Sequence, residues 1–126
     1  YTSEAAQRLL NEAARYLGTP YVWGGYSPSG FDCSGFVSYC LTNSGVRNTG
    51  RLTAQGLYNI CTPVSQSEAQ PGDLIFFTGT YDAGEPVTHI GIYVGNGQMV
   101  HCGHPVQYTS INSPYWQSHF YGFGRW

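Results

Sequence analysis

The stretch HIGIYVGNGQMVHC, residues 89–102, contains two apolar runs on either side of a glycine-rich turn. The alternation along each run is typical of β-strands, in which successive side chains point to opposite faces of a sheet. Because a short turn at residues 95–97 joins the runs, the stretch predicts an antiparallel hairpin. His89 and His101, one on each strand, are the side chains whose placement depends most on its register.

The length of the turn decides which residues face one another. A three-residue turn would pair Val94 with Gln98 and leave both histidines on one face, about 7 to 8 Å apart at the backbone. A two-residue turn at 96–97 would instead move His101 among the isoleucines, where an imidazole without a partner is costly. We therefore expect the three-residue turn, with His89 and His101 sharing a face. The opposite, apolar face would hold Ile90, Ile92, Val94, Val100 and Cys102.

Helical patterns precede this hairpin, and further strand patterns surround it. Apolar residues recur at helical spacing over 3–17 and 33–44, and more weakly over 52–59. The Gly-, Pro- and aromatic-rich residues 18–31 indicate an ordered loop. The predicted strands are 73–77, 89–95, 98–102, 105–110 and 120–126. Helices first and antiparallel strands afterwards predict an α+β fold with a sheet of about five or six strands.

The composition indicates a small domain with few charges. Only 10% of the 126 residues are charged, and the formal net charge is −2. The sequence shows no basic patch that could bind a nucleic acid, and its longest apolar runs are far too short to span a membrane. We expect one monomeric domain, residues 1–126, without a nucleic-acid partner or a membrane span. Because the chain starts at Tyr1 and shows no signal peptide, we also expect it to come from a longer secreted or multidomain protein.

Cys33 stands where the glycine-rich loop turns into the second predicted helix. If Asp32 caps that helix, the thiol lies over free backbone N–H groups at the positive end of the helix dipole, which favours the reactive thiolate. A cysteine nucleophile also needs a base, and the shared histidine face supplies His89, with His101 to orient it. The other cysteines, Cys40, Cys61 and Cys102, are expected to be structural, and no disulfide to Cys33 is expected.

Other interpretations of the same residues stay open at this point. Cys33 could be a buried, inert cysteine, and the two histidines could be idle on an exposed strand face. A zinc site built from Cys33, His89, His101 and Cys102 is also conceivable, since all four are good ligand types. Strand alternation turns Cys102 away from His101, however, and the chain has no CxxC or HxxxH spacing. We therefore expect no metal and no cofactor.

Taken together, these motifs resemble the NlpC-type cell-wall cysteine peptidases, a bacterial branch of the papain-like fold. The matching segments are PYVWGG (20–25), the run from 28 that ends in DCSGF (32–36), PGDLIFF (71–77), THIGIYVG (88–95) and MVHC (99–102). They stand in the order of that family and span residues 20–102. The resemblance implies a papain-like α+β fold in which N-terminal helices pack on an antiparallel sheet.

The resemblance also implies roles for individual residues. Carried over one by one, it makes Cys33 the nucleophile, His89 the base and His101 the polar residue that holds the imidazole. It matches Tyr21 to a tyrosine that donates to the oxyanion or contacts the substrate. The backbone N–H of Cys33 is a further oxyanion donor expected from the helix start.

The remaining candidate binding residues are Asp32 and Ser34. The resemblance matches Asp32 to an acid associated with substrate recognition, although helix capping alone would also explain it. Ser34 and Gly35 are small residues that would let the first helical turn crowd the sheet.

The usual reaction of the resembled family is hydrolysis of the γ-D-glutamyl to L-diamino-acid bond in peptidoglycan stem peptides, through a thioester. The resemblance therefore implies a secreted thiol protease that acts in cell-wall degradation, outside a bacterium or in its cell wall. An amidase or acyltransferase with the same Cys-His site and a non-catalytic cell-wall binding module are the alternatives. The diamino acid accepted and the need for a free N-terminal L-Ala stay open.

Overall fold

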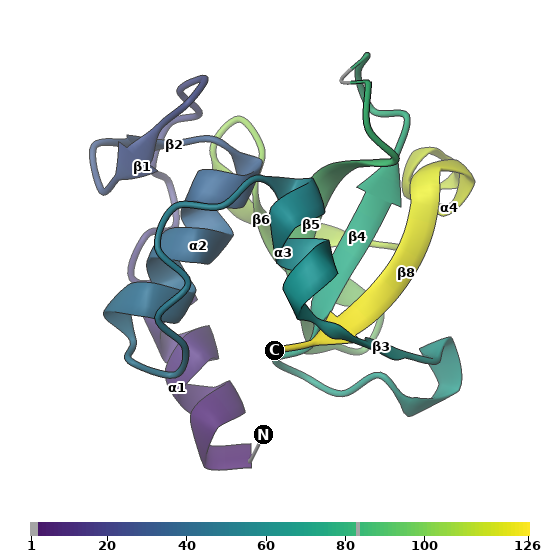
Figure 1. Ribbon diagram of the computed structural model, residues 1–126, viewed down its shortest axis with the longest axis horizontal. Coiled ribbons are helices and arrows are strands. Elements are labelled where there is room, and N and C mark those ends of the chain that lie inside the picture. Colours follow the sequence, from purple (N-terminus) through teal and green to yellow (C-terminus); the bar gives the residue numbers. More distant parts are fainter. Residues whose placement is uncertain (1–2, 83) are drawn as a thin grey trace.

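A computed structural model describes residues 3–82 and 84–126, and it contains one six-stranded antiparallel sheet with helices packed on it (Figure 1). The strands of that sheet are β3 (Thr62–Val64), β4 (Leu74–Thr78), β5 (Val87–Gly95), β6 (Gln98–Cys102), β7 (Val106–Ser110) and β8 (Phe120–Arg125). Their order is β3-β8-β4-β5-β6-β7. The helices are α1 (Ser3–Ala14), α2 (Cys33–Asn43), α3 (Ala54–Ile60) and α4 (Pro114–His119), with a short 3-10 turn at Gln66–Glu68. The predicted α+β fold is confirmed.

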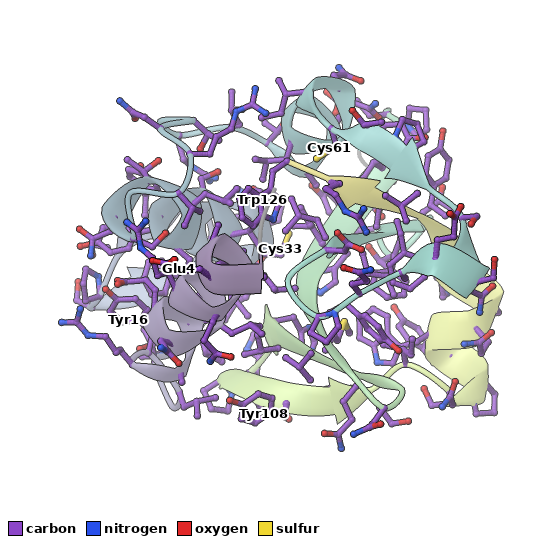
Figure 2. All side chains as sticks on the ribbon, turned by 90° about the horizontal axis from the view of Figure 1, so that it is seen from below. Glu4, Tyr16, Cys33, Cys61, Tyr108 and Trp126 are labelled. Atoms are coloured by element: carbon purple, nitrogen blue, oxygen red, sulfur yellow. The ribbon has the colours of Figure 1, made fainter. Side chains whose placement is uncertain are left out.

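The apolar core is divided by the sheet into two clusters. The larger one lies between the helices and the face that carries Phe76, Ile90 and Val100. The smaller one, on the opposite face, includes Phe77 and Met99. Strand β4 contributes to both clusters, which is why its sequence, LIFF, is apolar without alternation. Seen from below, Cys33, the first residue of α2, lies near the middle of the molecule (Figure 2).

The β5–β6 hairpin has the predicted faces but not the predicted turn. Ile92 pairs with Val100, which is the expected register for the body of the strands. The turn itself has two residues, 96–97, and both have a positive φ, 53° and 72°. A bulge between Tyr93 and Gly95 takes up the extra residue. The three-residue turn was therefore wrong, because the prediction assumed regular pairing right up to the turn.

Several element boundaries also differ from the prediction. Helix α1 ends at Ala14, and the residues up to Gly18 form turns. The loop at 18–31 contains a two-stranded hairpin, β1 (Tyr26–Ser27) with β2 (Gly30–Phe31). Neither β3 nor α4 was predicted, because three and six residues are too few to show a period. In the described part of the chain, no helix is long and apolar enough to cross a membrane.

Candidate active site

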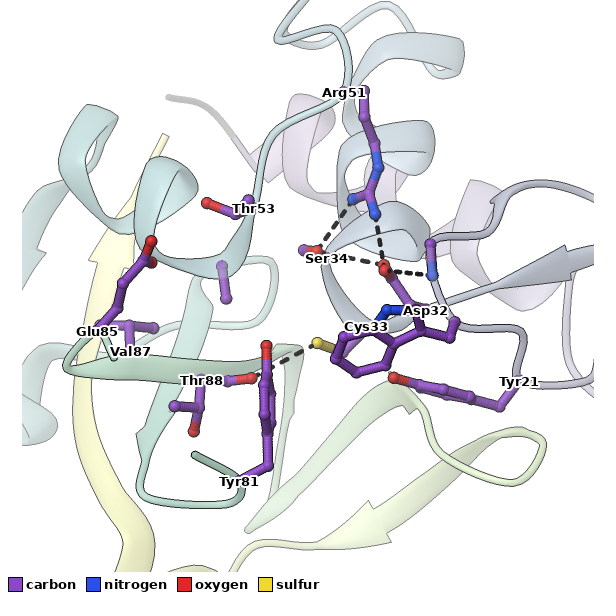
Figure 3. A pocket seen from close by; sticks show the side chains of 13 residues that line it. Tyr21, Asp32, Cys33, Ser34, Arg51, Thr53, Tyr81, Glu85, Val87 and Thr88 are labelled. Carbon is purple, nitrogen blue, oxygen red and sulfur yellow. Dashed lines mark hydrogen bonds and ion pairs between the residues drawn. The ribbon is translucent and has the colours of Figure 1, made fainter. Parts of the chain in front are cut away.

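Helix α2 begins at Cys33 because Asp32 caps it, as the sequence predicts. Asp32 has an extended backbone, and its Oδ1 accepts a hydrogen bond of 2.6 Å from the N–H of Gly35. This cap fixes the first turn of the helix against the sheet. The thiol of Cys33 consequently lies 3.8 Å from the carbonyl oxygen of Thr88 on β5 (Figure 3).

The surroundings of Cys33 keep its thiol protonated at neutral pH. Burial raises the pKa of the thiol to about 11, and the negative charge of Asp32 acts in the same direction. The backbone N–H groups of Ser34 and Ile90 and the charge of Arg51 act in the opposite direction and are outweighed. The expectation of a thiolate at the helix start is therefore not met, because burial of the sulfur, to which the carboxylate of the capping Asp32 adds, outweighs the backbone N–H groups. A base has to take the proton.

The two histidines lie on one face of the hairpin, as predicted, and are hydrogen-bonded in a row. His89 Nε2 is 2.9 Å from His101 Nδ1, and His101 Nε2 is 2.8 Å from Thr109 Oγ1 on β7. Both contacts are satisfied when His101 Nε2 donates a proton to Thr109 Oγ1 and His101 Nδ1 accepts one from His89 Nε2. In that arrangement His89 Nδ1, the ring nitrogen nearer to the backbone of β5, has no proton.

Both imidazoles are neutral at neutral pH. Burial lowers the pKa of His101 to about 4. Burial also lowers the pKa of His89, and the neighbouring His101 lowers it further. His89 is therefore in the form that can accept a proton.

Trp116 of α4 covers the histidine pair, and sequence reasoning missed it. Its ring stacks on His89 with a centroid distance of 5.2 Å and an interplanar angle of 28°, and it meets His101 edge-on at 5.3 Å. The pair Ser113-Pro114 is the one sequence signal for this helix, since the serine side chain caps it and proline suits the first helical position.

Cys33 and the two imidazole rings belong to different packing layers. Cys33 packs in the larger core with Ile90, whereas His89 and His101 lie on the face that Trp116 covers. Successive residues of a strand point to opposite faces, so the side chains of His89 and Ile90 diverge. Cys33 instead contacts the backbone of β5 on either side of His89.

Arg51 is a second residue that sequence reasoning missed. Its Nη2 is 2.7 Å from Asp32 Oδ2, and its Nη1 donates to Ser34 Oγ at 3.0 Å (Figure 3). The hydroxyl of Ser34 in turn donates to Asp32 Oδ1 at 3.2 Å. Arg51 and Asp32 are 19 residues apart in the sequence, so no local pattern connects them. The three side chains form one polar network beside the thiol.

Tyr21 also lies next to Cys33, and its ring packs against that of His104 at 4.8 Å. Burial raises the pKa of Tyr21 to about 12, so its hydroxyl keeps a proton that it can donate.

Gly35 has a different role from the one predicted. A Cβ at this position would lie 1.9 Å from the carbonyl oxygen of Gly25, so Gly35 makes room for the loop before β1 and not for the sheet.

A cavity of about 260 Å³ opens beside the thiol. One side of it is formed by Tyr21, Asp32, Ser34 and Arg51, and Figure 3 shows Thr53, Tyr81, Glu85, Val87 and Thr88 on the other side of Cys33. At the rim, the exposed rings of Trp23 and Tyr81 meet edge-on at 5.5 Å. His89 and His101 are not among the described residues that line the cavity.

The four possible zinc ligands are not brought together. Cys102 lies in the larger core, where its Sγ is 3.2 Å from the carbonyl oxygen of Phe31. Cys40 lies in the same core, as predicted, and all four cysteines are free thiols. Within residues 3–82 and 84–126, no group of three or more His, Cys, Asp or Glu side chains could hold a metal ion.

Comparisons with known proteins agree with one another. A profile of the NlpC/P60 family matches residues 18–125. The chain is 44% identical over 121 residues to the bifunctional muramidase/DL-endopeptidase CwlT of Bacillus subtilis. This match covers 94% of the chain and 36% of CwlT. The chain is also 47% identical over 118 residues to the probable endopeptidase p60 of Listeria seeligeri. This match covers 93% of the chain and 21% of p60.

The structural comparison gives the same result. The crystal structure of a lipoprotein-like NLP/P60 protein from Staphylococcus aureus matches with a TM-score of 0.92 and 42% sequence identity, and the match covers 99% of this chain and 42% of that one. The chain thus spans well under half of the length of each of these relatives.

Proposed function

Since the chain belongs to the NlpC/P60 family, we propose that it is the catalytic domain of a cysteine endopeptidase that hydrolyses peptidoglycan stem peptides. Its α+β fold is the papain-like fold of that family. The observation that carries the proposal is the Cys33 thiol at the capped start of α2, in contact with β5 on either side of His89. The proposed bond is the one between γ-D-glutamate and the L-diamino acid, as the resemblance implies.

The first chemical step transfers a proton and forms a bond. His89 Nδ1 takes the proton of the Cys33 thiol, and the sulfur attacks the carbonyl carbon of the scissile amide. The negative charge then moves to the carbonyl oxygen, where the backbone N–H of Cys33 and the hydroxyl of Tyr21 donate hydrogen bonds. The site holds a thiol and a neutral imidazole at neutral pH, and the raised pKa of Cys33 and the lowered pKa of His89 both make the proton transfer uphill, so it accompanies the attack on the carbonyl carbon and does not precede it.

The second step releases the two products in turn. Protonated His89 gives its proton to the leaving amine as the C–N bond breaks, which leaves a thioester on Cys33. His89 then removes a proton from water, and the resulting attack frees the new carboxylate and restores the thiol. His101 and Thr109 hold the imidazole, and Trp116 shields its hydrogen bond from water. Asp32 and Ser34, held by Arg51, are proposed to contact the substrate from the side of α2.

We also propose the setting in which this domain works. The two curated relatives are much longer than the chain, which supports a single catalytic domain within a longer protein. Activity on peptidoglycan would place that protein outside a bacterium or in its cell wall. The domain would act as a monomer on a stem peptide, without a metal or another cofactor.

Mass spectrometry of the fragments released from a defined stem peptide tests the proposal. Cys33→Ala should abolish turnover, while Cys61→Ala, a control thiol outside the cavity, should keep it. His89→Ala should lose more activity than His101→Ala, because orienting is a supporting role. Full activity of Cys33→Ala, or the reverse order of the two histidine variants, would contradict the assignment.

The alternatives give different results in the same assay. An amidase or acyltransferase shares the thioester, but a transferase would leave the acyl group on an added amine or alcohol. A non-catalytic binding module would release no fragments.

A further inference from the structure

Glu85 carries a charge in the cavity wall that the proposed mechanism does not use. Figure 3 shows its side chain on the opposite side of Cys33 from Asp32 and Arg51. These three are the charged side chains that line the cavity, and Arg51 is bonded to Asp32 at 2.7 Å. Glu85 itself takes part in no ion pair in the described part of the chain. The cavity therefore has one uncompensated negative charge, at the Glu85 end.

The proposed mechanism puts the leaving half of the substrate at that same end. His89 has to protonate the leaving amine, so this amine must come close to β5. Glu85 belongs to the segment that leads into β5, three residues before Thr88, whose carbonyl contacts the thiol. At the rise of an extended chain, three residues span about 10 Å. The leaving residue can have a side chain with a flexible four-carbon stem. Together with the side chain of Glu85, it covers such a distance.

The groups around Glu85 suit a positively charged partner. The ring of Tyr81 and the uncharged side chains of Thr53 and Thr88 line this side of the cavity, and the one cation in the lining, Arg51, lies across from it (Figure 3). Burial raises the pKa of Tyr81, and the charges of Cys33, Asp32 and Glu85 raise it further, which agrees with a position between the thiol and Glu85. An ammonium group is attracted both to a carboxylate and to an aromatic face.

We infer that Glu85 selects for positive charge on the side chain of the leaving diamino acid. This inference rests on the proposed function. A lysine side chain brings an ammonium alone, whereas meso-diaminopimelate brings an ammonium and a carboxylate. Because the second carboxylate would meet Glu85 without a cation beside it, the domain prefers a leaving residue whose side chain has a net positive charge.

Three synthetic peptides, L-Ala-γ-D-Glu-L-Xaa with lysine, Nε-acetyl-lysine or meso-diaminopimelate in the last position, test the inference. The wild-type kcat/KM for the lysine peptide should exceed that for each of the other two by about two- to five-fold, the size of an ion pair with an exposed carboxylate such as that of Glu85. The preference should decrease at high salt. In Glu85→Gln the ratio of kcat/KM for the lysine peptide to kcat/KM for the acetyl-lysine peptide should fall to about one, because the side chain at position 85 loses its charge and keeps its shape.

Asp82→Asn is the matched control. Asp82 belongs to the same loop and loses the same charge in the variant, but it does not line the catalytic cavity. This variant should keep the wild-type ratio. Equal kcat/KM values for the lysine and acetyl-lysine peptides in the wild type, or a ratio that Glu85→Gln leaves unchanged, would overturn the inference while the peptidase activity stands. Cleavage of none of the three peptides by the wild type would instead refute the proposed function, and the inference with it.

Discussion

Asp32 connects the fold to the chemistry at the scale of a single residue. Its two oxygens accept hydrogen bonds from the N–H groups of Gly35 and Gly24, the hydroxyl of Ser34 and the guanidinium of Arg51. The same carboxylate caps α2 and raises the pKa of the adjacent thiol. The sequence suggested capping or substrate contact, and the structure adds control of the thiol proton.

Asp32→Asn should therefore lower the pKa of Cys33. The amide keeps the size of the side chain and an oxygen for the cap, but it removes a negative charge that disfavours the thiolate and frees the charge of Arg51. The rate of iodoacetamide alkylation of Cys33, followed as a function of pH, measures this shift. Asp82→Asn serves as the control and should leave the alkylation profile in place. An unchanged or raised pKa in Asp32→Asn would show that the carboxylate does not act on the thiol.

Thr109 is expected to act through His101, as a positioning residue. Thr109→Val removes the hydroxyl that is 2.8 Å from His101 Nε2 and keeps the shape of the side chain. Loss of one such hydrogen bond costs about 1 kcal/mol, so kcat should fall roughly five-fold. KM should stay the same, because Thr109 does not line the cavity described here. Thr109→Ser restores the hydroxyl and should restore kcat; a serine variant as slow as the valine variant would argue for a packing role.

At the scale of elements, α2 and the loop before β1 are packed too tightly for any side chain at Gly35. A Cβ there would lie 1.9 Å from the Gly25 carbonyl oxygen and 2.9 Å from Asp32 Oδ1. Gly35→Ala should therefore lower the free energy of unfolding by about 1 to 3 kcal/mol, as other overpacked sites do. The midpoint of urea denaturation measures it. Gly122→Ala, where a Cβ meets nothing within 4 Å, should stay within about 0.5 kcal/mol of the wild type. Similar losses in both variants would contradict this explanation.

The elements with a clear period were predictable from the sequence, and the exceptions have physical reasons. The hydrophobic alternation of β5 and β6 identified the histidine face correctly, because burial penalises any other register. The bulge near Val94 could not be predicted, because the apolar pattern is the same whether the extra residue lies in the strand or in the turn. Trp116 and Arg51 were missed because their partners are distant in the sequence and α4 has only six residues.

At the scale of the whole molecule, the proposed catalytic groups come from two halves of the chain that meet only in the folded state. The thiol belongs to the helical half, and the histidine row belongs to the sheet. The C-terminal strand β8 pairs with both β3 and β4. Arg125 on β8 donates to the buried carboxylate of Asp73 just before β4, at 2.8 and 2.9 Å. Burial in the folded chain is the largest cause of the pKa shifts of Cys33, His89 and His101.

Those shifts predict that the domain loses stability as the pH falls below neutrality. His101 is 4% exposed, and its pKa is lowered from 6.5 to about 4. Below pH 6.5 the unfolded chain binds a proton that the folded chain does not bind until about pH 4, so protons favour unfolding throughout this window. The free energy of unfolding should fall by up to about 1.4 kcal/mol per pH unit from this group. The lowered pKa of His89 acts in the same direction.

Thermal unfolding of the wild type and of His101→Asn across this pH window isolates the contribution of His101. Carboxylates that titrate in the same range are common to both proteins, so the difference in the pH dependence of Tm reports His101 together with its effect on the pKa of His89. The wild-type Tm should fall more steeply with decreasing pH than the Tm of His101→Asn, although the variant starts from a lower value because it loses the bonds to His89 and Thr109. If instead the two proteins show parallel curves, His101 is not held neutral by the fold.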